Sequence, residues 1–417
     1  MRICFLVNDL QLSGGIGVVV EHARQLHQHH GFDVTLVLVR EQDMPNWRYE
    51  QLTGLHVVPL AEAQEQRYDV AVATWWETVF SLFSIPAQRR AIFVQSLEDR
   101  FYRPDEPDRL GAALILDLPV AFITEARWIQ RTLAELRPDA PCHLVRNGID
   151  KSVFTPLERL DVRLDPPLRV LIEGNPGVWF KHVPEAIAAT ALMTEPRDVT
   201  VVSGERSELA DAPVDRVVGP LTHREMADLY ADTDVLLKLS SVEGMFGPPL
   251  EAFHRGATCV VTPVTGHEEY VVHDHNGLIC DWDDLRGTAR LLDLLARDRR
   301  YLHYLRLNAL ETARGWPSWE QAGQFMAMSL ERIAREPAPD PAPAAARLLS
   351  DLREGIEAQR LALHDYRELA GKAQRLEKIM GLPPLRQARR LRRSRRLLRA
   401  LSPLRPLYRR ARGRLLE

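Results

Sequence analysis

Cysteine is scarce in this sequence: four residues in 417, Cys4, Cys142, Cys259 and Cys280, with no C-x-x-C spacing. We therefore expect reduced core cysteines of a cytosolic protein rather than a disulfide framework or a metal site. Long apolar runs are also missing. No stretch reaches the roughly 18 apolar residues of a membrane span, and the opening MRICFLVN lacks the apolar core of a signal peptide. No P-loop, G-x-S-x-G or H-E-x-x-H motif occurs, which argues against the enzyme classes that use them.

Charge is divided unevenly along the chain. The net charge is −3, yet residues 384–417 hold 13 arginines, no lysine and one acidic residue, so this tail carries about +12 and residues 1–383 about −15. Leucines interleave with the arginines, as in basic helices that lie on anionic lipid, where each surface Arg contributes ~1 kcal/mol. We expect the tail to hold a cytoplasmic protein at the inner face of a membrane. An acidic protein partner or no partner is the alternative; nucleic acid is disfavoured because no known binding module accompanies the charge.

Short β-branched runs alternate with segments of helical period, which predicts an α/β fold with parallel sheets covered by helices. The alternation runs through residues 1–155 and restarts in 156–318, so we expect two Rossmann-like domains that face each other across a cleft. Ligands of such sheets bind at the carboxyl ends of the strands. The expected strands are 2–8, 33–39, 69–74, 91–95 and 120–123, then 169–173, 199–203, 235–239, 258–262 and 277–280. The expected helices are 17–29, 125–136, 184–192, 223–231 and 249–254, with further helices from 285 to 336.

A helical extension is expected after the second domain. A crossover helix over 319–336 leads to a Pro/Ala linker over 337–347, in which EPAPDPAPAAA holds four prolines. Apolar residues at 3–4 spacing over 348–381 favour a coiled coil in a homodimer, and a single helix packed on the body is the alternative. The Arg-rich tail fills 382–417. The spaced positions are Leu349, Leu352, Ile356, Gln359, Leu363, Tyr366, Ala370, Ala373, Glu377 and Met380.

The segment SSVEGMFGPPLEAFHRGATCVV (240–261) places Glu243 and Glu251 eight residues apart around a Gly-Pro turn between two apolar runs. Pro248 and Pro249 suit the first positions of a helix, which puts Glu251 in its first turn. Free N–H groups at a helix start, with Gly247 permitting close approach, form an anion site suited to a diphosphate. Glu251 can then accept hydrogen bonds from a ribose and Glu243 from a second sugar, which describes a nucleotide sugar. An ordinary strand–turn–helix whose Glu251 favours the helix dipole is the alternative.

This segment resembles the donor motif of the retaining glycosyltransferases of family four, which have the two-domain GT-B fold. Three more segments resemble the family in the right order: RNGIDKSVFTP (146–156), GHEEYVVHDHNGLIC (266–280) and GWPSWEQAGQFM (315–326). The resemblance covers residues 1–335, and FVQSLEDRFYRP (93–104) looks nearest to rhamnosyltransferase-like, surface-polysaccharide members. It implies a hexosyltransferase that moves a sugar from a nucleoside-diphosphate donor to a glycan acceptor, a surface polysaccharide or lipid-linked glycan, with retention of configuration and without metal or cofactor.

The resemblance also implies roles on the donor side. Glu251 binds the ribose, Glu243 lies beside the transferred sugar, and the backbone of Gly244, Met245, Phe246, Gly247 and Pro248 meets phosphate and sugar. The family's EGFGLPPLE reads EGMFGPPLE here. Phe246 and Gly247 therefore stand one place later than usual, which leaves open which amide meets the phosphate.

The family further places an Arg and a Lys on the diphosphate. In IEGNPGVWFKHVPEAI, Lys181 aligns with the Lys and Asn175 stands where the Arg would be. Lys181 would offset the charge of the leaving group, the largest contribution such catalysis needs, so Lys181 and Glu243 are the expected catalytic residues. Lys238 is a candidate replacement for the Arg, or else a solvated lysine at a strand end.

In the first domain, LSGGIGVVVEHA puts Gly14, Gly15 and Gly17 between the first strand and the first helix and resembles the family's loop over the diphosphate; a plain tight turn is the alternative. The same resemblance places Gln95, Glu98 and Tyr102 toward the cleft on the acceptor side. Trp75 or Trp76 can stack on an acceptor sugar, since aromatic faces suit the apolar faces of pyranoses. Core packing is the alternative for at least one of them.

Two metal-like patterns are set aside. The D-x-D of Asp232–Asp234 directly precedes an apolar run, and HQHH (27–30) is favoured electrostatically at a helix C-terminus. Among donors, dTDP-rhamnose is favoured, with GDP-mannose next. Two rival functions stay open: a nucleotide-sugar epimerase of the same fold, and a non-catalytic glycan-assembly scaffold, which the Asn175 departure favours.

Overall fold

The structure is a computed structural model that describes residues 1–11, 13–40, 50–336 and 342–380. The Arg-rich tail and part of the expected linker lie outside these residues. The chain forms two compact units, Met1–Glu354 and Gly355–Glu417. Of the helices described, none combines the length and apolar character needed to cross a membrane.

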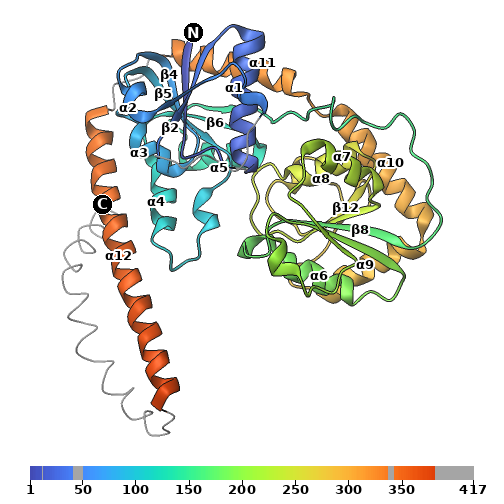
Figure 1. Cartoon of the computed structure of the whole chain (residues 1–417). Helices are drawn as coiled ribbons and strands as arrows, with labels where there is room; N and C mark the ends of the chain where they lie inside the picture. The colour runs from blue at the N-terminus through green and yellow to red at the C-terminus, as the bar shows by residue number, and fades with distance from the viewer. Residues whose placement is uncertain (12, 41–49, 337–341, 381–417) are drawn as a thin grey trace. The chain divides into compact units, whose positions relative to one another are not determined.

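The first unit holds two parallel sheets, each with helices packed around it (Figure 1). The first sheet has seven strands in the order β3-β2-β1-β4-β5-β6-β7. We call this sheet and its helices the first half. Its strands are β1 (Arg2–Val7), β2 (Asp33–Leu38), β3 (His56–Pro59), β4 (Tyr68–Ala73), β5 (Ala87–Val94), β6 (Ala121–Thr124) and β7 (Cys142–Leu144). Its helices are α1 (Gly14–His30), α2 (Leu60–Gln64), α3 (Val79–Leu82), α4 (Asp108–Leu114) and α5 (Arg127–Leu136).

The second sheet has six strands in the order β10-β9-β8-β11-β12-β13, and it forms the second half with its helices. Its strands are β8 (Leu168–Glu173), β9 (Arg197–Val202), β10 (Arg216–Val218), β11 (Val235–Lys238), β12 (Thr258–Val261) and β13 (Leu278–Ile279). Its helices are α6 (Val183–Ala191), α7 (His223–Asp232), α8 (Gly247–His254), α9 (Leu285–Arg297) and α10 (Arg299–Gly315), followed by α11 (Trp319–Arg335) and α12 (Ala342–Met380). In both sheets the strand order reverses beside the first strand, as in Rossmann folds.

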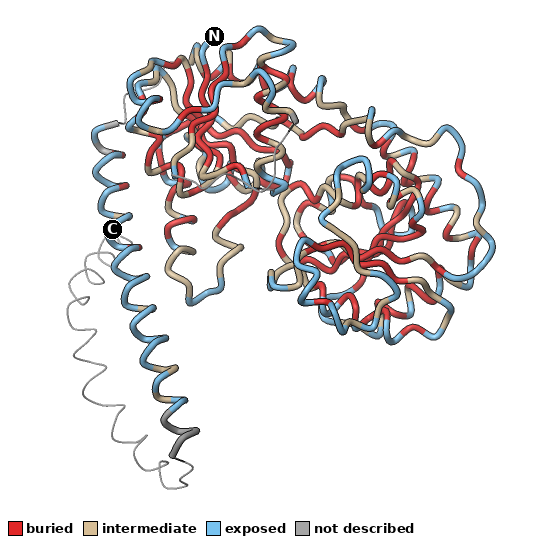
Figure 2. Tube along the Cα trace, viewed as in Figure 1, coloured by how far each residue is buried: buried red, intermediate tan, exposed pale blue. Residues whose placement is uncertain are grey.

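Central strands of both sheets are buried on both faces, because helices cover each side. In β1, five consecutive residues after Arg2 are buried, and all four residues of β11 and of β12 are buried. Figure 2 shows these strands as continuous buried traces inside each half. Such strands read as unbroken apolar runs, which explains why the sequence located them.

The chain crosses between the halves twice, and the two crossings lie side by side. Ile149 forms a parallel bridge with Ser318, and the backbone amide of Ile149 donates to the carbonyl of Pro317 at 3.1 Å. A Cβ on Gly148 would lie 2.3 Å from the amide nitrogen of Trp319, so only glycine fits here. After this point α11 packs against α1 and adds Met326, Leu330 and neighbours to the core of the first half (Figure 1).

The expected α/β fold of two Rossmann-like halves is confirmed, and all ten expected strands are present within a few residues. The sequence analysis missed β3, β7 and β10, which are edge strands of three or four residues. One correction concerns α1. It begins at Gly14, not Gly17, so Gly14, Gly15 and Gly17 lie in its first turn rather than in a loop before it. Ser13 caps this turn by accepting the amide of Ile16 at 3.2 Å.

Helix α12 begins at Ala342, inside the range 337–347 that was expected to be linker, and continues without a break to Met380. Beyond Gly355 most of its described surface is exposed (Figure 2). Leu361 and Leu369, which are outside the expected apolar spacing, are 66% and 65% exposed, and Tyr366, which is within it, is 60% exposed. The coiled coil stays a prediction.

Candidate active site

Four charged side chains meet at the carboxyl ends of β8 and β11. Lys181, in the 3-10 helix η5 (Trp179–Lys181), donates to Glu243 Oε1 at 2.8 Å. Lys238, the last residue of β11, lies 3.8 Å from the same oxygen and 2.5 Å from Oε2 of Glu173, the last residue of β8. Glu243 therefore stands between two ammonium groups, at the strand ends where ligands of doubly wound sheets bind. Glu173 was not identified from the sequence.

Lys238 is not a solvated strand-end lysine, because only 2% of it is exposed. Burial alone would lower its pKa, but Glu173 and Glu243 outweigh burial and raise the pKa of Lys238. In the same way, burial raises and Lys238 and Lys181 lower the pKa of Glu173, with a net lowering. Both shifts favour the charged forms of Glu173 and Lys238, and each carboxylate of the cluster lies beside a lysine.

Helix α8 starts directly after this cluster, and it corrects one expectation. The helix begins at Gly247, so Pro248 and Pro249 lie in its first turn, which contains no acidic residue. Glu251 is in the second turn, where Tyr230 donates to its Oε2 at 3.4 Å. Burial and the nearby Glu173 raise the pKa of Glu251 to about 7, partly offset by the bond from Tyr230 and by Lys238.

Phe246 caps α8 in a left-handed conformation, with φ 65° and ψ 60°. A non-glycine residue in the left-handed region costs ~1–2 kcal/mol. The family motif EGFGLPPLE has glycine at the position of Phe246. The side chain is 2% exposed in the core of the second half, and its carbonyl accepts a hydrogen bond from the hydroxyl of Tyr270. Burial and this bond hold the strained cap, so a bulky residue occupies a left-handed position here.

The loop of Glu243, Gly244 and Met245 is held by the first half. Ser96 Oγ donates to the carbonyl of Glu243 at 3.5 Å, Trp128 Nε1 to that of Gly244 at 2.9 Å, and the Met245 amide donates to Glu125 Oε1 at 3.1 Å. A Cβ on Gly244 would lie 2.0 Å from the carbonyl oxygen of Gln95. Only glycine permits this approach, so packing between the two halves requires glycine at position 244 whether or not a ligand is bound.

Glu125 follows β6 and was not identified from the sequence. It is 5% exposed, and Asn147 donates to its Oε2 at 2.7 Å. Burial raises the pKa of Glu125 to about 7, partly offset by the bonds from Asn147 and Met245. Its position at the carboxyl end of the parallel strand β6 was the signal that could have found it.

Glu269 was also not identified from the sequence. Its Oε1 accepts the amides of Arg127 and Trp128, at 2.6 Å and 3.2 Å, and so caps the N-terminus of α5 from the other half. Its Oε2 pairs with Arg146 at 3.2 Å. Arg146, Asn147 and Glu269 all lie in segments that resembled the family, but the resemblance assigned them no role.

The expected glycines of the first half lie near this loop only in part. A Cβ on Gly15 would lie 3.3 Å from Gln95 Oε1, so Gly15, Gln95 and Gly244 are neighbours. Gly14 has no atom near its would-be Cβ. The side chain of Asn175 bonds within its own loop: its Oδ1 accepts a hydrogen bond from the amide of Gly177 at 2.8 Å and closes a local turn.

On the acceptor side the structure separates the two tryptophans. Trp76 is 1% exposed, and its Nε1 donates to the hydroxyl of Tyr102 at 2.8 Å. Its backbone amide donates to Glu98 Oε2 at 2.6 Å, and burial raises the pKa of Glu98 to about 8 despite this bond. Trp76 and Glu98 are therefore core residues here, whereas Trp75 is partly exposed.

The D-x-D segment forms ion pairs. Asp234 is 1% exposed and contacts Arg163 at 3.0 Å, with Arg169 and Arg299 each at 3.4 Å. The described residues contain no group of three His, Cys, Asp or Glu suited to a metal ion.

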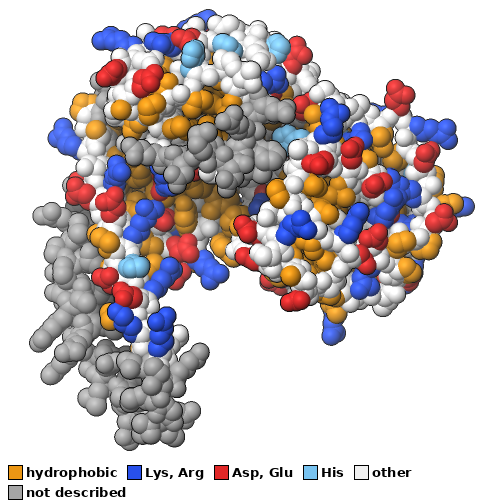
Figure 3. All heavy atoms as spheres, viewed as in Figure 1, with side chains coloured by type: hydrophobic (Ala, Val, Ile, Leu, Met, Phe, Trp, Pro, Cys, Tyr) orange, Lys and Arg blue, Asp and Glu red, His pale blue; other side chains and the backbone are white. Residues whose placement is uncertain are grey.

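Acidic and basic side chains are mixed over the visible face of the second half (Figure 3).

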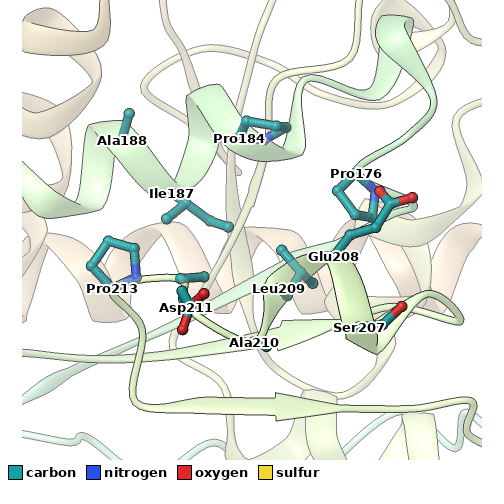
Figure 4. A pocket seen from close by; sticks show the side chains of 11 residues that line it. Pro176, Pro184, Ile187, Ala188, Ser207, Glu208, Leu209, Ala210, Asp211 and Pro213 are labelled. Atoms are coloured by element: carbon teal, nitrogen blue, oxygen red, sulfur yellow. The ribbon is translucent and has the colours of Figure 1, made fainter.

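A separate pocket of about 450 Å³ lies between the start of α6 and the 3-10 helix η6 (Arg206–Leu209). Figure 4 shows Ile187 and Leu209 on its facing walls and Glu208 beside Pro176. None of the expected site residues lines it. We assign it no part in the site.

A known protein family matches part of the second half. Residues 172–298 match the family model described as "Glycosyl transferases group 1". The match includes Lys181, Lys238, Glu243 and Glu251. Comparison with curated proteins found no match.

Solved structures match the fold of both halves. A sucrose-phosphate synthase from Thermosynechococcus elongatus aligns with TM-score 0.64 and 16% identity, over 80% of this chain and 98% of its own. HepE of Anabaena, solved with UDP and glucose, aligns with TM-score 0.63 and 15% identity, over 80% of this chain and 100% of its own. A TarM variant of S. aureus, in complex with fondaparinux, α-GlcNAc-glycerol and UDP, aligns with TM-score 0.63 and 8% identity, over 80% of this chain and 100% of its own. The chain therefore has the GT-B fold, and residues 172–298 of its second half match the model of group 1 glycosyl transferases.

Proposed function

We propose that this chain is a glycosyltransferase that moves a sugar from a nucleoside-diphosphate-sugar donor to a glycan acceptor. The observation that carries the proposal is the Lys181–Glu243 pair, 2.8 Å apart at the carboxyl ends of β8 and β11. This pair lies within the segment that matches group 1 glycosyl transferases. A paired, partly buried charge beside a helix start suits a substrate that carries both phosphate and hydroxyl groups.

The donor would bind across this cluster. Its diphosphate would lie at the start of α8, its ribose against Glu251, and its sugar beside Glu243. Lys181 would leave Glu243 to meet the phosphate and stabilise the charge that develops on the leaving group, which requires no metal ion. We propose retention of configuration without a covalent enzyme intermediate, and domain closure would exclude water during transfer.

Lys238 is the basic group that compensates for Asn175. It cannot reach solvent easily, being 2% exposed, but it adds a second positive charge 3.8 Å from Glu243. We propose that it holds Glu173 and Glu243 in place while Lys181 turns to the phosphate. Asn175 itself would then act through its turn rather than through charge.

Turnover tests the proposal directly. The full chain is incubated with UDP-, GDP- and dTDP-sugars, including UDP-glucose because HepE is also solved with it, and with dTDP-rhamnose and GDP-mannose. Nucleoside diphosphate release is followed together with the anomeric configuration of the product by NMR. Transfer with retention supports the proposal, and Lys181→Ala should lower the rate by roughly 100-fold or more. Lys151→Ala, which removes an exposed lysine bond to Arg314, is the matched control.

The two rivals give different outcomes in this assay. An epimerase would change the donor sugar with no acceptor present. A scaffold would release no nucleotide from any donor while keeping its fold. Either outcome would replace the transferase proposal.

We further propose that residues 384–417 hold the enzyme on an anionic membrane, where a lipid-linked or surface-polysaccharide acceptor would be found. The support is the charge of about +12 interleaved with leucines. Cosedimentation with vesicles of anionic lipid tests this: the full chain should bind and lose affinity as salt rises. Unchanged binding after removal of residues 384–417 would refute it.

Dimerisation through residues 348–381 is proposed on the apolar spacing along α12. Leu363 lies within this spacing and is only partly buried. Leu363→Lys should convert a dimer to a monomer in light scattering, whereas Leu361→Lys, outside the spacing, should not. A monomeric full chain would contradict the proposal.

A further inference from the structure

A row of four aromatic rings links the two halves next to the charged cluster. Trp75 stacks on Phe101 with ring centroids 5.9 Å apart and planes 25° apart. Phe101 lies 5.2 Å from Phe180, and Phe180 lies 5.6 Å from Trp179. We call these four residues the aromatic path.

Each member of the aromatic path comes from the carboxyl end of a strand. Trp75 follows β4, and Phe101 lies in η3 (Glu98–Phe101) after β5. Trp179 and Phe180 lie in η5 after β8. The indole of Trp179 donates to the carbonyl of Phe101 at 3.3 Å, so the path is continuous from one half to the other. Carboxyl ends of strands are where ligands of these sheets bind.

The rings are not core residues. Trp179 is 39% exposed, and Trp75, Phe101 and Phe180 are each partly exposed. By contrast, the neighbouring Trp76 is 1% exposed. Apolar surface left in water costs free energy in proportion to its area, and a ligand that covers the rings would recover part of it.

The path ends at the reacting groups. Lys181 Nζ lies 5.6 Å from the centre of the Phe180 ring and 2.8 Å from Glu243 Oε1. A ligand on these rings therefore has an apolar face below it and an ion pair at one end. A pyranose matches both, because its C–H face packs on aromatic rings and its hydroxyls can bond to the pair. A hydrocarbon chain would desolvate the pair without replacing its hydrogen bonds, which is costly.

We propose that the aromatic path is the binding surface for the pyranose rings of the glycan acceptor, with Trp179 as its most exposed platform. This rests on the proposed function, since it names the acceptor side of the same site. It assigns a role to Phe101, Trp179 and Phe180, and to Trp75 rather than Trp76.

The test is saturation-transfer NMR on the full chain with a panel of methyl pyranosides in the gluco, galacto, manno, rhamno and N-acetylglucosamine configurations. At least one should receive saturation at its ring C–H protons. Trp179→Ala should weaken its binding about threefold to tenfold, and Trp179→Phe should restore part of the loss. Trp282→Ala is the matched control, because Trp282 is 47% exposed but is outside the aromatic path.

Two results would overturn the inference: a folded chain that binds no pyranoside, or equal losses in Trp179→Ala and Trp282→Ala. Titration of UDP, GDP and dTDP in the same samples separates this inference from the proposed function. Pyranoside binding that depends on Trp179, without binding of any nucleotide, would remove the transferase and keep the sugar surface. Nucleotide binding without any pyranoside would do the reverse.

Discussion

The carboxylate of Glu125, from the first half, accepts the backbone amide of Met245, from the second half, at 3.1 Å. Met245 belongs to the loop that presents Glu243, so the first half fixes the backbone beside the charged cluster. A carboxylate oxygen thus occupies the position that an anionic ligand would take on this amide. The position of the loop therefore depends on contacts from the first half.

Glu125→Ala should lower the free energy of unfolding by ~1–3 kcal/mol, because it leaves the buried Asn147 amide group and the Met245 N–H without this partner. Urea unfolding followed by fluorescence measures the loss. Glu135→Ala, on the exposed side of α5, should change stability by less than about 0.5 kcal/mol. Equal effects of the two changes would show that the Glu125 contact is not formed.

Trp128→Phe removes the indole N–H that donates to the carbonyl of Gly244 at 2.9 Å, and it replaces the buried indole by a smaller aromatic ring. We expect a loss of ~0.5–1.5 kcal/mol in donor binding, a fall of about twofold to tenfold, because the loop loses one of its three bonds to the first half. Calorimetry with whichever nucleotide sugar the unaltered chain binds measures this loss of affinity. Trp282→Phe removes an exposed indole elsewhere and should leave the affinity unchanged; a fall of the same size there would contradict the assignment.

Glu98 should make the protein less stable as the pH rises. Burial raises the pKa of Glu98 from 4.5 to about 8, so the folded chain holds a proton that the unfolded chain releases. The contribution of Glu98 to stability is therefore largest below about pH 4.5, and it is lost as the pH rises toward 8. Glu98→Gln keeps an oxygen for the Trp76 amide and cannot ionise.

Unfolding in urea at pH 6, 7, 8 and 9 checks this expectation. The Glu98→Gln protein should lose less stability than the unaltered chain across that window. Glu125 and Glu251, whose pKa values are raised to about 7, would still contribute to the slope in both proteins. Parallel curves for the two proteins would mean that Glu98 ionises freely in the fold.

Phe246→Gly sets two effects against each other. Glycine relieves the left-handed strain, worth ~1–2 kcal/mol, but removes a side chain that is 2% exposed, which costs ~3–5 kcal/mol. The net expectation is a loss of about 2 kcal/mol in thermal or urea unfolding. A stabilised variant would show that strain at this cap outweighs its packing.

The sequence specified most of the fold because its central strands are unbroken apolar runs, as in β1 and β11. It did not reveal β10, whose three residues Arg216–Val218 are only partly buried or exposed at the edge of a sheet. The start of α1 was also misplaced, since three glycines in a first turn read as a loop until Ser13 is seen to cap them.

The sequence could point to candidate site residues where they lie close together in the chain, as Glu243 and Glu251 do, and their roles stay predictions. The site was not predictable where partners come from different halves. Glu125 and Glu269 act on segments more than a hundred residues away, and no local pattern contains that information. Likewise, only burial could separate Trp75 from Trp76.

Donor binding tests the central claim most directly. The experiment is calorimetry of the full chain with UDP-, GDP- and dTDP-sugars. The Glu251→Ala protein is measured in parallel. Glu311→Ala is the control, because the Glu311 side chain is 74% exposed. The account predicts saturable binding of one donor that Glu251→Ala weakens by roughly tenfold or more, about 1.4 kcal/mol, while Glu311→Ala binds as the unaltered chain does. A folded chain that binds none of these donors, or one whose affinity ignores Glu251, would contradict it.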